Sequence, residues 1–311
     1  SGDLPILGFQ NGDAKRRCPM PAAVLPPMAR RSFLQIAALG GFATVFGYEA
    51  CADESGLHLA LLSDTHIPAD KQPGARGFNA FEQLTSIVSD LVATNADGLV
   101  ITGDAAQLTG EKDDYAVLLD VLQPVTEAMP MYIALGNHDN RDNFMEMVKT
   151  LPGERPEVED KHVTIIEHPA VRIVLLDSLF YVRQRGGLLG KAQREWLKTY
   201  LEANADRPAI LMFHHTIGDG DNDLLDILRL FDLAKPFPHL KALFYGHSHR
   251  WEIGKREGIH TINLPTAAHI WTPDQPIGWV DARFRADGMA LTMHAFAGNR
   301  ALDGQVFEFN W

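Results

Sequence analysis

Short apolar runs alternate with longer amphipathic stretches from residue 57 onward. The apolar runs predict strands at 57–64, 97–104, 131–137, 162–167, 171–178, 208–215 and 240–249, and further strands between 259 and 296. Helical spacing predicts helices at 78–95, 113–125, 189–204 and 223–234, the second of them stopped near Pro124. This alternation indicates an α/β fold, with strands apolar enough to be buried on both faces. No repeat or low-complexity linker interrupts it, so we expect one domain over 53–311.

Composition narrows the class of protein. The 311 residues are 46% hydrophobic, which is enough for a sizeable core. The formal net charge of −12 disfavours a nucleic-acid partner or a membrane-coating role, since both present negative charge. The two cysteines, Cys18 and Cys51, both precede the predicted domain. A disulfide framework or a cysteine-based zinc site is therefore excluded from the main body, whereas histidine is abundant at 13 residues.

The segment 28–52 has the composition of an export signal. Arg30 and Arg31 precede a mildly apolar stretch that is too short to span a bilayer, and the segment ends in a small-x-small cleavage pattern. It resembles the bacterial twin-arginine signal, although Ala29 and Gln35 depart from that pattern.

The resemblance implies a partner, the twin-arginine translocation machinery, and a periplasmic or exported location. An ordinary amphipathic helix is the alternative for the same segment. Residues 1–27 are expected to be vector sequence or a mis-called leader. N-terminal sequencing of exported material would test the export hypothesis, which predicts a mature protein beginning at Asp53.

Five predicted strands end in residues that bind metals or carry protons. These endings are Asp64 with His66; Asp104; Asn137 with His138 and Asp139; His214 with His215; and His247 with His249. Taken singly, each has an ordinary explanation, because Asp and Asn are common caps and turn residues. In α/β sheets, however, ligand sites lie outside the carboxyl ends of the strands. Five such endings therefore predict one shared site.

The residue types at these endings suit a metal centre without cysteine. Imidazole binds zinc and iron, and carboxylate and carbonyl oxygens also bind manganese. The two-residue spacing in Asp64-x-His66 and His247-x-His249 is expected to place both side chains on one face of a strand. Seven of these ten residues are candidate ligands, and the other three are His138, Asp139 and His215. Seven ligands are too many for one tetrahedral ion and suit two ions that share a ligand. Asp104, with two carboxylate oxygens, is the best candidate for the shared ligand.

The order of these motifs resembles the calcineurin-like metallophosphoesterases over essentially all of 57–296. The motifs are Asp64-x-His66, Gly103-Asp104, Gly136-Asn137-His138-Asp139, His214 and Gly246-His247-x-His249. The resemblance implies a four-layer αββα sandwich of two mixed β-sheets flanked by helices. It also implies two metal sites, one formed by Asp64, His66, Asp104 and His249, and the other by Asp104, Asn137, His214 and His247.

The same resemblance implies an enzyme that hydrolyses a small-molecule phosphate ester and uses two divalent or trivalent metal ions as cofactors. These ions would be Fe, Mn or Zn. A hydroxide that bridges the ions would attack phosphorus. His138 would stabilise developing charge or protonate the leaving oxygen, and Asp139 would orient His138 or a metal-bound histidine. The competing hypothesis, a binding protein without activity, predicts the loss of a ligand or of His138, and all are present.

Strings such as LLSDTHI and ALGNHDNRDNF are most similar to the class III cyclic-nucleotide phosphodiesterases. Arg141 is a candidate contact for a substrate phosphate, with a solvated charge at a helix start as the alternative. His215 is a second candidate, although Thr216 and Ile217 replace the two prolines that usually follow it in this branch.

Two features complicate the choice of substrate. The acidic loop 218–223 counts against an anionic nucleotide as the substrate. It is not a calcium loop, because Leu224 stands where such a loop has Gly at position six and no Glu closes it. An exported enzyme would rarely meet cyclic AMP, which favours scavenged diesters such as glycerophosphodiesters. We therefore expect a phosphodiesterase, with phosphomonoesterase activity as the alternative. Trp251, Trp271 and Trp279 are candidates for the mouth of the site, with core packing the default for at least one.

Overall fold

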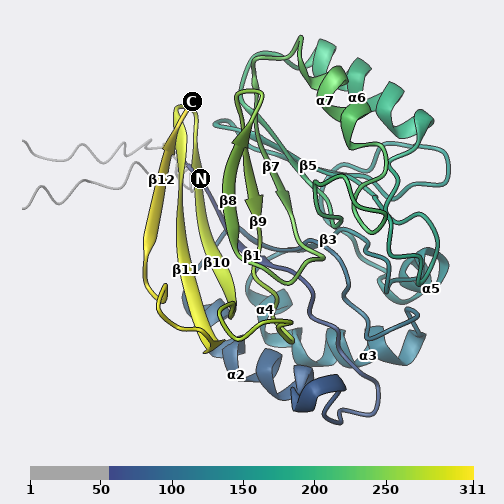
Figure 1. The fold of residues 1–311 in the computed structure, drawn as a ribbon, viewed down its shortest axis with the longest axis vertical. Helices are drawn as coiled ribbons and strands as arrows, with labels where there is room; N and C mark the ends of the chain where they lie inside the picture. Colours follow the sequence, from purple (N-terminus) through teal and green to yellow (C-terminus); the bar gives the residue numbers. More distant parts are fainter. Residues whose placement is uncertain (1–55) are drawn as a thin grey trace, which may run out of the picture. The chain divides into compact units, whose positions relative to one another are not determined.

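The computed structural model describes residues 56–311, and two six-stranded β-sheets form the centre of this region (Figure 1). The predicted leader at 1–27 and the predicted export signal at 28–52 lie outside the described residues.

The first sheet has the strand order β12-β11-β10-β1-β2-β3. Its strands are β1 (Leu57–Leu62), β2 (Gly98–Ile101), β3 (Met131–Ile133), β10 (Pro276–Arg285), β11 (Gly288–Gly298) and β12 (Val306–Asn310). β1, β2 and β3 are parallel, and β10 joins β1 in antiparallel register. This sheet is therefore mixed, and the carboxyl ends of its three parallel strands lie at one edge.

The second sheet has the order β4-β5-β6-β7-β9-β8. Its strands are β4 (Thr164–Glu167), β5 (Arg172–Leu175), β6 (Ala209–Met212), β7 (Leu240–Tyr245), β8 (Glu252–Arg256) and β9 (Ile259–Asn263). The four inner strands are parallel and the two outer strands are antiparallel to them, so this sheet is also mixed.

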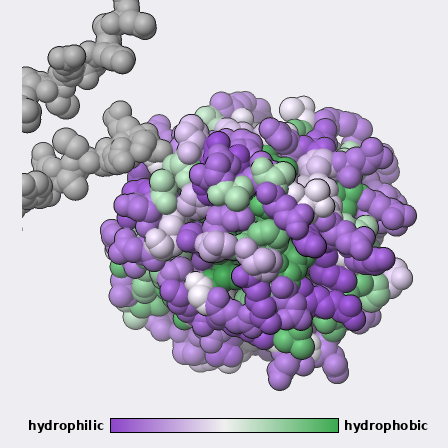
Figure 2. All heavy atoms as spheres, turned by 90° about the horizontal axis from the view of Figure 1, so that it is seen from above, coloured by the Kyte–Doolittle hydropathy of each residue, from purple (hydrophilic) through white to green (hydrophobic). Residues whose placement is uncertain are grey.

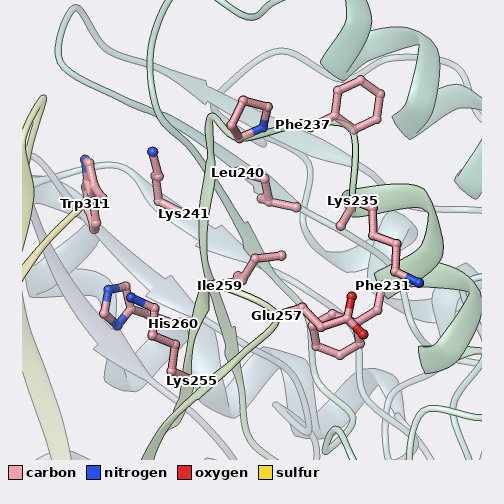
Figure 3. Close-up of a pocket in the computed structure, with 13 residues that line it drawn as sticks. Phe231, Lys235, Phe237, Leu240, Lys241, Lys255, Glu257, Ile259, His260 and Trp311 are labelled. Atoms are coloured by element: carbon pink, nitrogen blue, oxygen red, sulfur yellow. The ribbon is translucent and has the colours of Figure 1, made fainter.

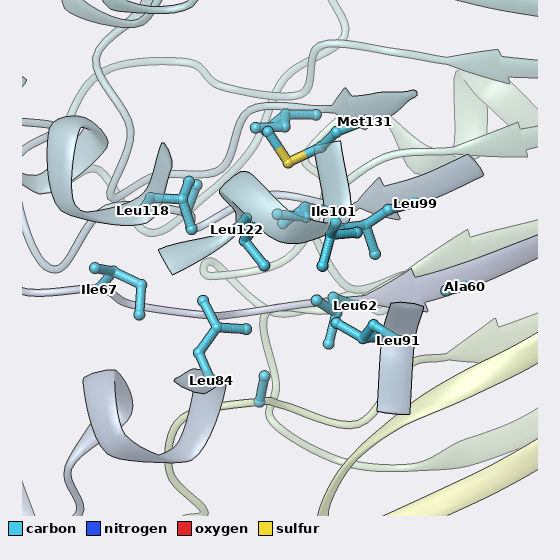
Figure 4. Packing of buried hydrophobic residues seen from close by; sticks show 14 of the residues in the cluster. Ala60, Leu62, Ile67, Leu84, Leu91, Leu99, Ile101, Leu118, Leu122 and Met131 are labelled. Carbon is cyan, nitrogen blue, oxygen red and sulfur yellow. The ribbon is translucent and has the colours of Figure 1, made fainter. Parts of the chain in front are cut away.

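Helices cover the outer face of each sheet. The helices are α2 (Ala80–Ala93), α3 (Lys112–Val121), α4 (Gln123–Ala128), α5 (Arg141–Met147), α6 (Lys191–Ala203) and α7 (Ile227–Ala234), with a short 3₁₀ helix at Ala75–Gly77. Apolar side chains of α2 to α5 share a buried cluster with the first sheet (Figure 4). Side chains of α6 and α7 share another with the second sheet. The predicted αββα sandwich is confirmed.

Strand β1 shows how a largely apolar run serves two cores. Leu57, Leu59 and Leu61 point into the core between the two sheets. Ala60 and Leu62 point into the core under the helices. Side chains of a strand alternate between its faces, so a strand between two cores carries apolar residues on both faces. The one polar residue of β1, His58, is paired with Asp281 at 2.8 Å. The prediction that the apolar runs are buried on both faces is confirmed here.

Some elements differ from the prediction. The helix expected over 113–125 is two helices, because Pro124 lies in the first turn of α4, where a missing N–H is tolerated. Helix α5 was considered only in the alternative that places Arg141 at a helix start, and strands β8 and β12 were not predicted. β8 is partly exposed at a sheet edge and carries charged residues, so it lacks an apolar run.

The face shown in Figure 2 is mostly hydrophilic, with hydrophobic side chains in small patches between polar ones. Within residues 56–311, none of the helices has both the length and the apolar character needed to cross a bilayer.

Candidate metal centre and active site

Loops from both sheets bring the seven candidate ligands together. They follow β1, β2 and β3 in the first sheet and β6 and β7 in the second. Six of the seven side chains are buried, and His247 is half-buried. The five strand endings singled out in the sequence therefore do meet at one place.

The ligand loops have an unusual backbone. Asp64, His66, Asp104, His247 and His249 all have positive φ angles, between 43° and 70°. Each such residue costs on the order of 1–3 kcal/mol and persists only where the surroundings enforce it. The strands end before these residues. The prediction that Asp64 and His66, and likewise His247 and His249, share one face of an extended strand is therefore wrong. Left-handed turns place the side chains instead.

One cluster of ligand atoms surrounds Asp64. His249 Nε2 lies 3.2 Å from Asp64 Oδ1, and His66 Nε2 lies 3.8 Å from the same oxygen. The two imidazole nitrogens are themselves only 3.1 Å apart.

The other nitrogen of each of these rings fixes its tautomer. His249 Nδ1 lies 2.6 Å from the His269 carbonyl oxygen, and His66 Nδ1 lies 3.3 Å from the Gln107 carbonyl oxygen. A carbonyl only accepts hydrogen bonds, so both Nδ1 atoms are donors and, in the neutral rings, both Nε2 atoms carry lone pairs. Two lone pairs that face each other at 3.1 Å suit a cation bound between them.

A second cluster of ligand atoms is formed by Asp104, His214 and His247. His214 Nε2 lies 3.2 Å from Asp104 Oδ2 and 3.2 Å from His247 Nδ1. Asp104 Oδ2 is also 3.7 Å from His66 Nε2 of the first cluster. Asp104 thus lies between the two groups, the place expected of a shared ligand.

The donor set fits metal ions. Asn137 Oδ1 and Asp64 Oδ1 are buried and accept no hydrogen bond from residues 56–311. A buried acceptor without a partner costs about 1–3 kcal/mol, which a cation would remove. Within the same residues, His66, Asp104 and His138 offer ligand atoms within 4.8 Å of one another, and so do Asp104, His214 and His247.

Electrostatics favour the metal-binding form of some of these groups and not of others. Burial would lower the pKa of His214, but Asp104 and Asp64 raise it to about 9, and Asp64 likewise raises the pKa of His249. Burial would raise the pKa of Asp64, but the nearby charges of His249 and His214 hold it below its usual value. Burial lowers the pKa of His66 to about 3 and that of His247 to about 4. Ionised carboxylates and neutral imidazoles are the forms that bind metal.

His138 lies at the surface of the site. Its backbone N–H donates to Asp104 Oδ1 at 2.8 Å, while its Nε2 is 3.9 Å from Asp104 Oδ2. The side chain is 26% exposed, which makes it more accessible than the buried carboxylates beside it.

Asp139 has different partners from those expected. Its oxygens accept the backbone N–H groups of Ala105, Ala106 and Gly136 at 2.9–3.3 Å and the Tyr115 hydroxyl at 3.1 Å. The expectation that Asp139 orients a histidine is therefore wrong. It ties the loop after β2 to the loop after β3, and so positions Asp104 and Asn137.

Gly136 has a packing role. A Cβ on this residue would collide with the Asp104 carboxylate and backbone. The residue has no positive φ angle, so it is required for the close approach of two ligand loops and not for a tight turn.

A cavity of about 760 Å³ opens over the ligands. His66, Asp104, Asn137, His138, His247 and His249 line it. The volume lies in the range typical of small-molecule sites and far exceeds a phosphate group. The organic part of an ester would therefore also be held inside this cavity.

The two predicted substrate contacts do not reach this cavity. Arg141 is paired with buried Asp177 at 2.6 and 3.1 Å, because the first turn of α5 directs it toward the second sheet. His215 is fully buried and its Nδ1 is 2.8 Å from Ser178 Oγ. Both side chains are therefore engaged by other residues of the protein in this structure, and their contact with substrate stays a prediction. Each residue supports the loops around the ligands.

Of the three tryptophans, Trp271 lines the cavity and is 50% exposed. The Arg76 guanidinium lies 4.5 Å from its ring centroid. Trp279 is buried and stacks on His294, and Trp251 packs against Phe307.

Sequence reasoning missed several residues that line the cavity, and Arg183, Arg185 and His269 are the basic residues among them. The His269 ring centroid is 4.3 Å from that of His249. None of the three follows a predicted strand directly. The only signal was two arginines spaced by one residue in an acidic chain.

A separate cavity of about 360 Å³ lies beside α7, β7 and β9 (Figure 3). Its walls include apolar Phe231, Leu240 and Ile259 and the lysines Lys241 and Lys255. None of the seven candidate ligands lines it, so the chemistry described above belongs to the larger cavity.

Comparisons with known proteins agree with this geometry. The model of the calcineurin-like phosphoesterase family matches residues 57–251. The 3′,5′-cyclic adenosine monophosphate phosphodiesterase CpdA of Haemophilus influenzae is 25% identical, over 78% of this chain and 90% of that protein. The glycerophosphodiester phosphodiesterase GpdQ of Enterobacter lignolyticus is 27% identical, over 68% of this chain and 77% of that protein.

Among solved structures, a dimetal phosphatase from Danio rerio has the same fold, with a TM-score of 0.63 at 14% identity over 82% of this chain and 99% of that one. The family match covers more than half of the chain, and the motifs that carried the resemblance all lie within its residues. The chain therefore belongs to the calcineurin-like phosphoesterase family and is a metal-dependent phosphoesterase.

Proposed function

We propose that this enzyme hydrolyses phosphodiesters at a centre of two metal ions. The observation that carries the proposal is the pair of ligand clusters on either side of Asp104, which is 3.2 Å from His214 and 3.7 Å from His66. One ion would be held by Asp64, His66, Asp104 and His249. The other would be held by Asp104, Asn137, His214 and His247. The donor set suits Fe, Mn or Zn.

When bound, two cations would neutralise phosphate oxygens and lower the pKa of water, as in other two-metal hydrolases. The protein's own contribution is to fix the ligands. Asp139 holds the two loops that carry Asp104 and Asn137 through four hydrogen-bond donors. The carbonyls of Gln107 and His269 hold the rings of His66 and His249. Little reorganisation is then needed as the substrate binds.

Three observations support a role for His138 on the ester itself. His138 is partly exposed, lines the cavity, and is anchored by its backbone N–H to Asp104. We assign it the stabilisation of charge on the phosphate or the donation of a proton to the leaving oxygen. Both tasks suit a group whose ordinary pKa is near neutrality.

Two lines of support favour a diester. The relatives at 25–27% identity are named for cyclic adenosine monophosphate and for glycerophosphodiesters, both phosphodiesters. The cavity also has room for organic groups beyond the phosphate. Activity on phosphomonoesters is the rival hypothesis.

A substrate panel with Mn²⁺ tests the proposal. It comprises bis-p-nitrophenyl phosphate, p-nitrophenyl phosphate, and the 2′,3′- and 3′,5′-cyclic nucleotides. We expect kcat/KM for the diester bis-p-nitrophenyl phosphate to exceed that for the monoester. A clear preference for p-nitrophenyl phosphate would favour the rival. Failure to hydrolyse any member with metal bound would overturn the proposal.

A further inference from the structure

The segment between β5 and α6 places two arginines in the cavity. Arg183 and Arg185 line it together with His138 and His247. Both are exposed, and they lie five and seven residues beyond Ser178, outside every motif that pointed to the metal centre.

The backbone of this segment is tied to the metal centre. The N–H of Arg183 donates to the carbonyl oxygen of Asn137 at 2.7 Å. Arg183 has a φ of 63°, a left-handed conformation that an arginine adopts only where its surroundings enforce it. Further along, the N–H of Gly187 donates to the Asp223 carbonyl at 3.0 Å. Arg183 is thus held one hydrogen bond from a candidate ligand.

The charges of these two arginines are not used within the fold. The guanidinium groups of Arg141 and Arg194 are paired with Asp177 and Asp226, whereas those of Arg183 and Arg185 have no ion-pair partner within residues 56–311. Asp223 also lines the cavity, but its Oδ2 accepts the Gly220 N–H at 2.9 Å. In a chain of net charge −12, the cavity over the ligands thus has two guanidinium groups on its wall whose charges remain available to an anion.

The number of charges indicates what they bind. A simple diester carries one negative charge, on the phosphate that the metal centre would hold. Two further cations line this cavity, and apart from the candidate ligands Asp223 is the one other carboxylate that residues 56–311 place in its lining, so at least one of the two arginines would be left without an anionic partner. Guanidinium groups bind phosphate and carboxylate through paired N–H donors, so a second anionic group on the substrate would match them.

We propose that Arg183 and Arg185 form an anion-binding arm, and that the preferred substrate is a phosphodiester whose alcohol portion carries a second anionic group. This inference rests on the proposed function, since the arm is defined relative to the phosphate at the metal centre. The arm selects among substrates by binding their second anionic group and takes no part in bond cleavage.

The test compares two esters that differ by one phosphate. They are thymidine 5′-(p-nitrophenyl phosphate) and the same ester with a 3′-phosphate. For the wild-type enzyme we expect kcat/KM to be about tenfold higher for the phosphorylated ester. The double variant Arg183→Gln/Arg185→Gln should lose that preference, because its kcat/KM for the phosphorylated ester should fall about tenfold more than its kcat/KM for the unphosphorylated ester. Arg229→Gln, at an exposed position on α7, is the matched control and should change neither value.

A binding measurement separates this inference from the proposed function. Calorimetry with thymidine 3′,5′-bisphosphate and thymidine 5′-monophosphate needs no turnover. We expect the double variant to bind the bisphosphate about tenfold more weakly and the monophosphate unchanged. Equal losses for both ligands, or no loss for either, would overturn the arm even if diesters are hydrolysed. Failure of hydrolysis with this binding difference intact would overturn only the proposed function.

Discussion

Asn137, His138 and Asp139 are adjacent in the chain and have three separate sets of partners. Asn137 Oδ1 is buried and unpartnered among the described residues, as a ligand oxygen would be without its ion. His138 faces the cavity. Asp139 is fully buried and bound by backbone N–H groups and Tyr115. In the proposed assignment, one short loop therefore supplies a ligand, a group for the substrate, and the support for both.

This division of roles predicts that two neighbouring substitutions affect different properties, turnover in one case and metal content in the other. His138→Ala should lower kcat by about a hundredfold to ten-thousandfold, because it removes a group that acts on the ester. Its metal content, measured by mass spectrometry, should be unchanged. Asn137→Ala should lower the metal content, because it removes a ligand. If His138→Ala lost metal to the same extent, the assignment of His138 to the substrate would be wrong.

At the scale of elements, the first turn of α5 is joined to the loop after β5. Arg141 begins the helix and forms two hydrogen bonds with Asp177, which also accepts the N–H groups of His162 and Leu179. Asp177 is fully buried, so its charge depends on these donors. This pair links a helix that covers the first sheet to the second sheet, and its role is structural.

Arg141→Ala should therefore lower the free energy of unfolding by about 3 kcal/mol, because a buried carboxylate loses its charged partner. The melting temperature should fall by roughly 10 °C. The matched control is Lys112→Ala, which removes an exposed pair with Glu146 and should cost less than about 1 kcal/mol. A large loss of kcat/KM at unchanged stability would instead restore Arg141 as a substrate contact.

Most elements could be predicted because their apolar patterns are strong. β1 is buried at every position and α2 buries one stripe of apolar residues, so run length and spacing identify both. β8 and α5 could not be predicted in this way. β8 has no buried residue, and α5 buries only Phe144, so neither has a pattern to detect. They form because neighbouring elements provide an edge and a surface.

At the scale of the whole described region, the metal centre depends on both sheets. Asp64, Asp104 and Asn137 follow strands of the first sheet, and His214 and His247 follow strands of the second. The sequence predicted one shared site because parallel strands place their carboxyl ends at one edge, and the resemblance to the family supplied the assignment of the ligands. Cavity residues such as Arg183 and His269 come from connecting loops, whose course the apolar pattern does not determine. Metal binding should therefore require the packed sandwich.

The most direct test of the central claim is a metal titration of chelator-treated protein. Bound Mn²⁺ and the hydrolysis of bis-p-nitrophenyl phosphate would be measured on the same samples. If the two clusters around Asp104 each hold an ion, metal-free protein will be inactive, and activity will level off at two bound ions per chain. Full activity without metal, or activity that is already maximal with one bound ion, would contradict the two-metal assignment.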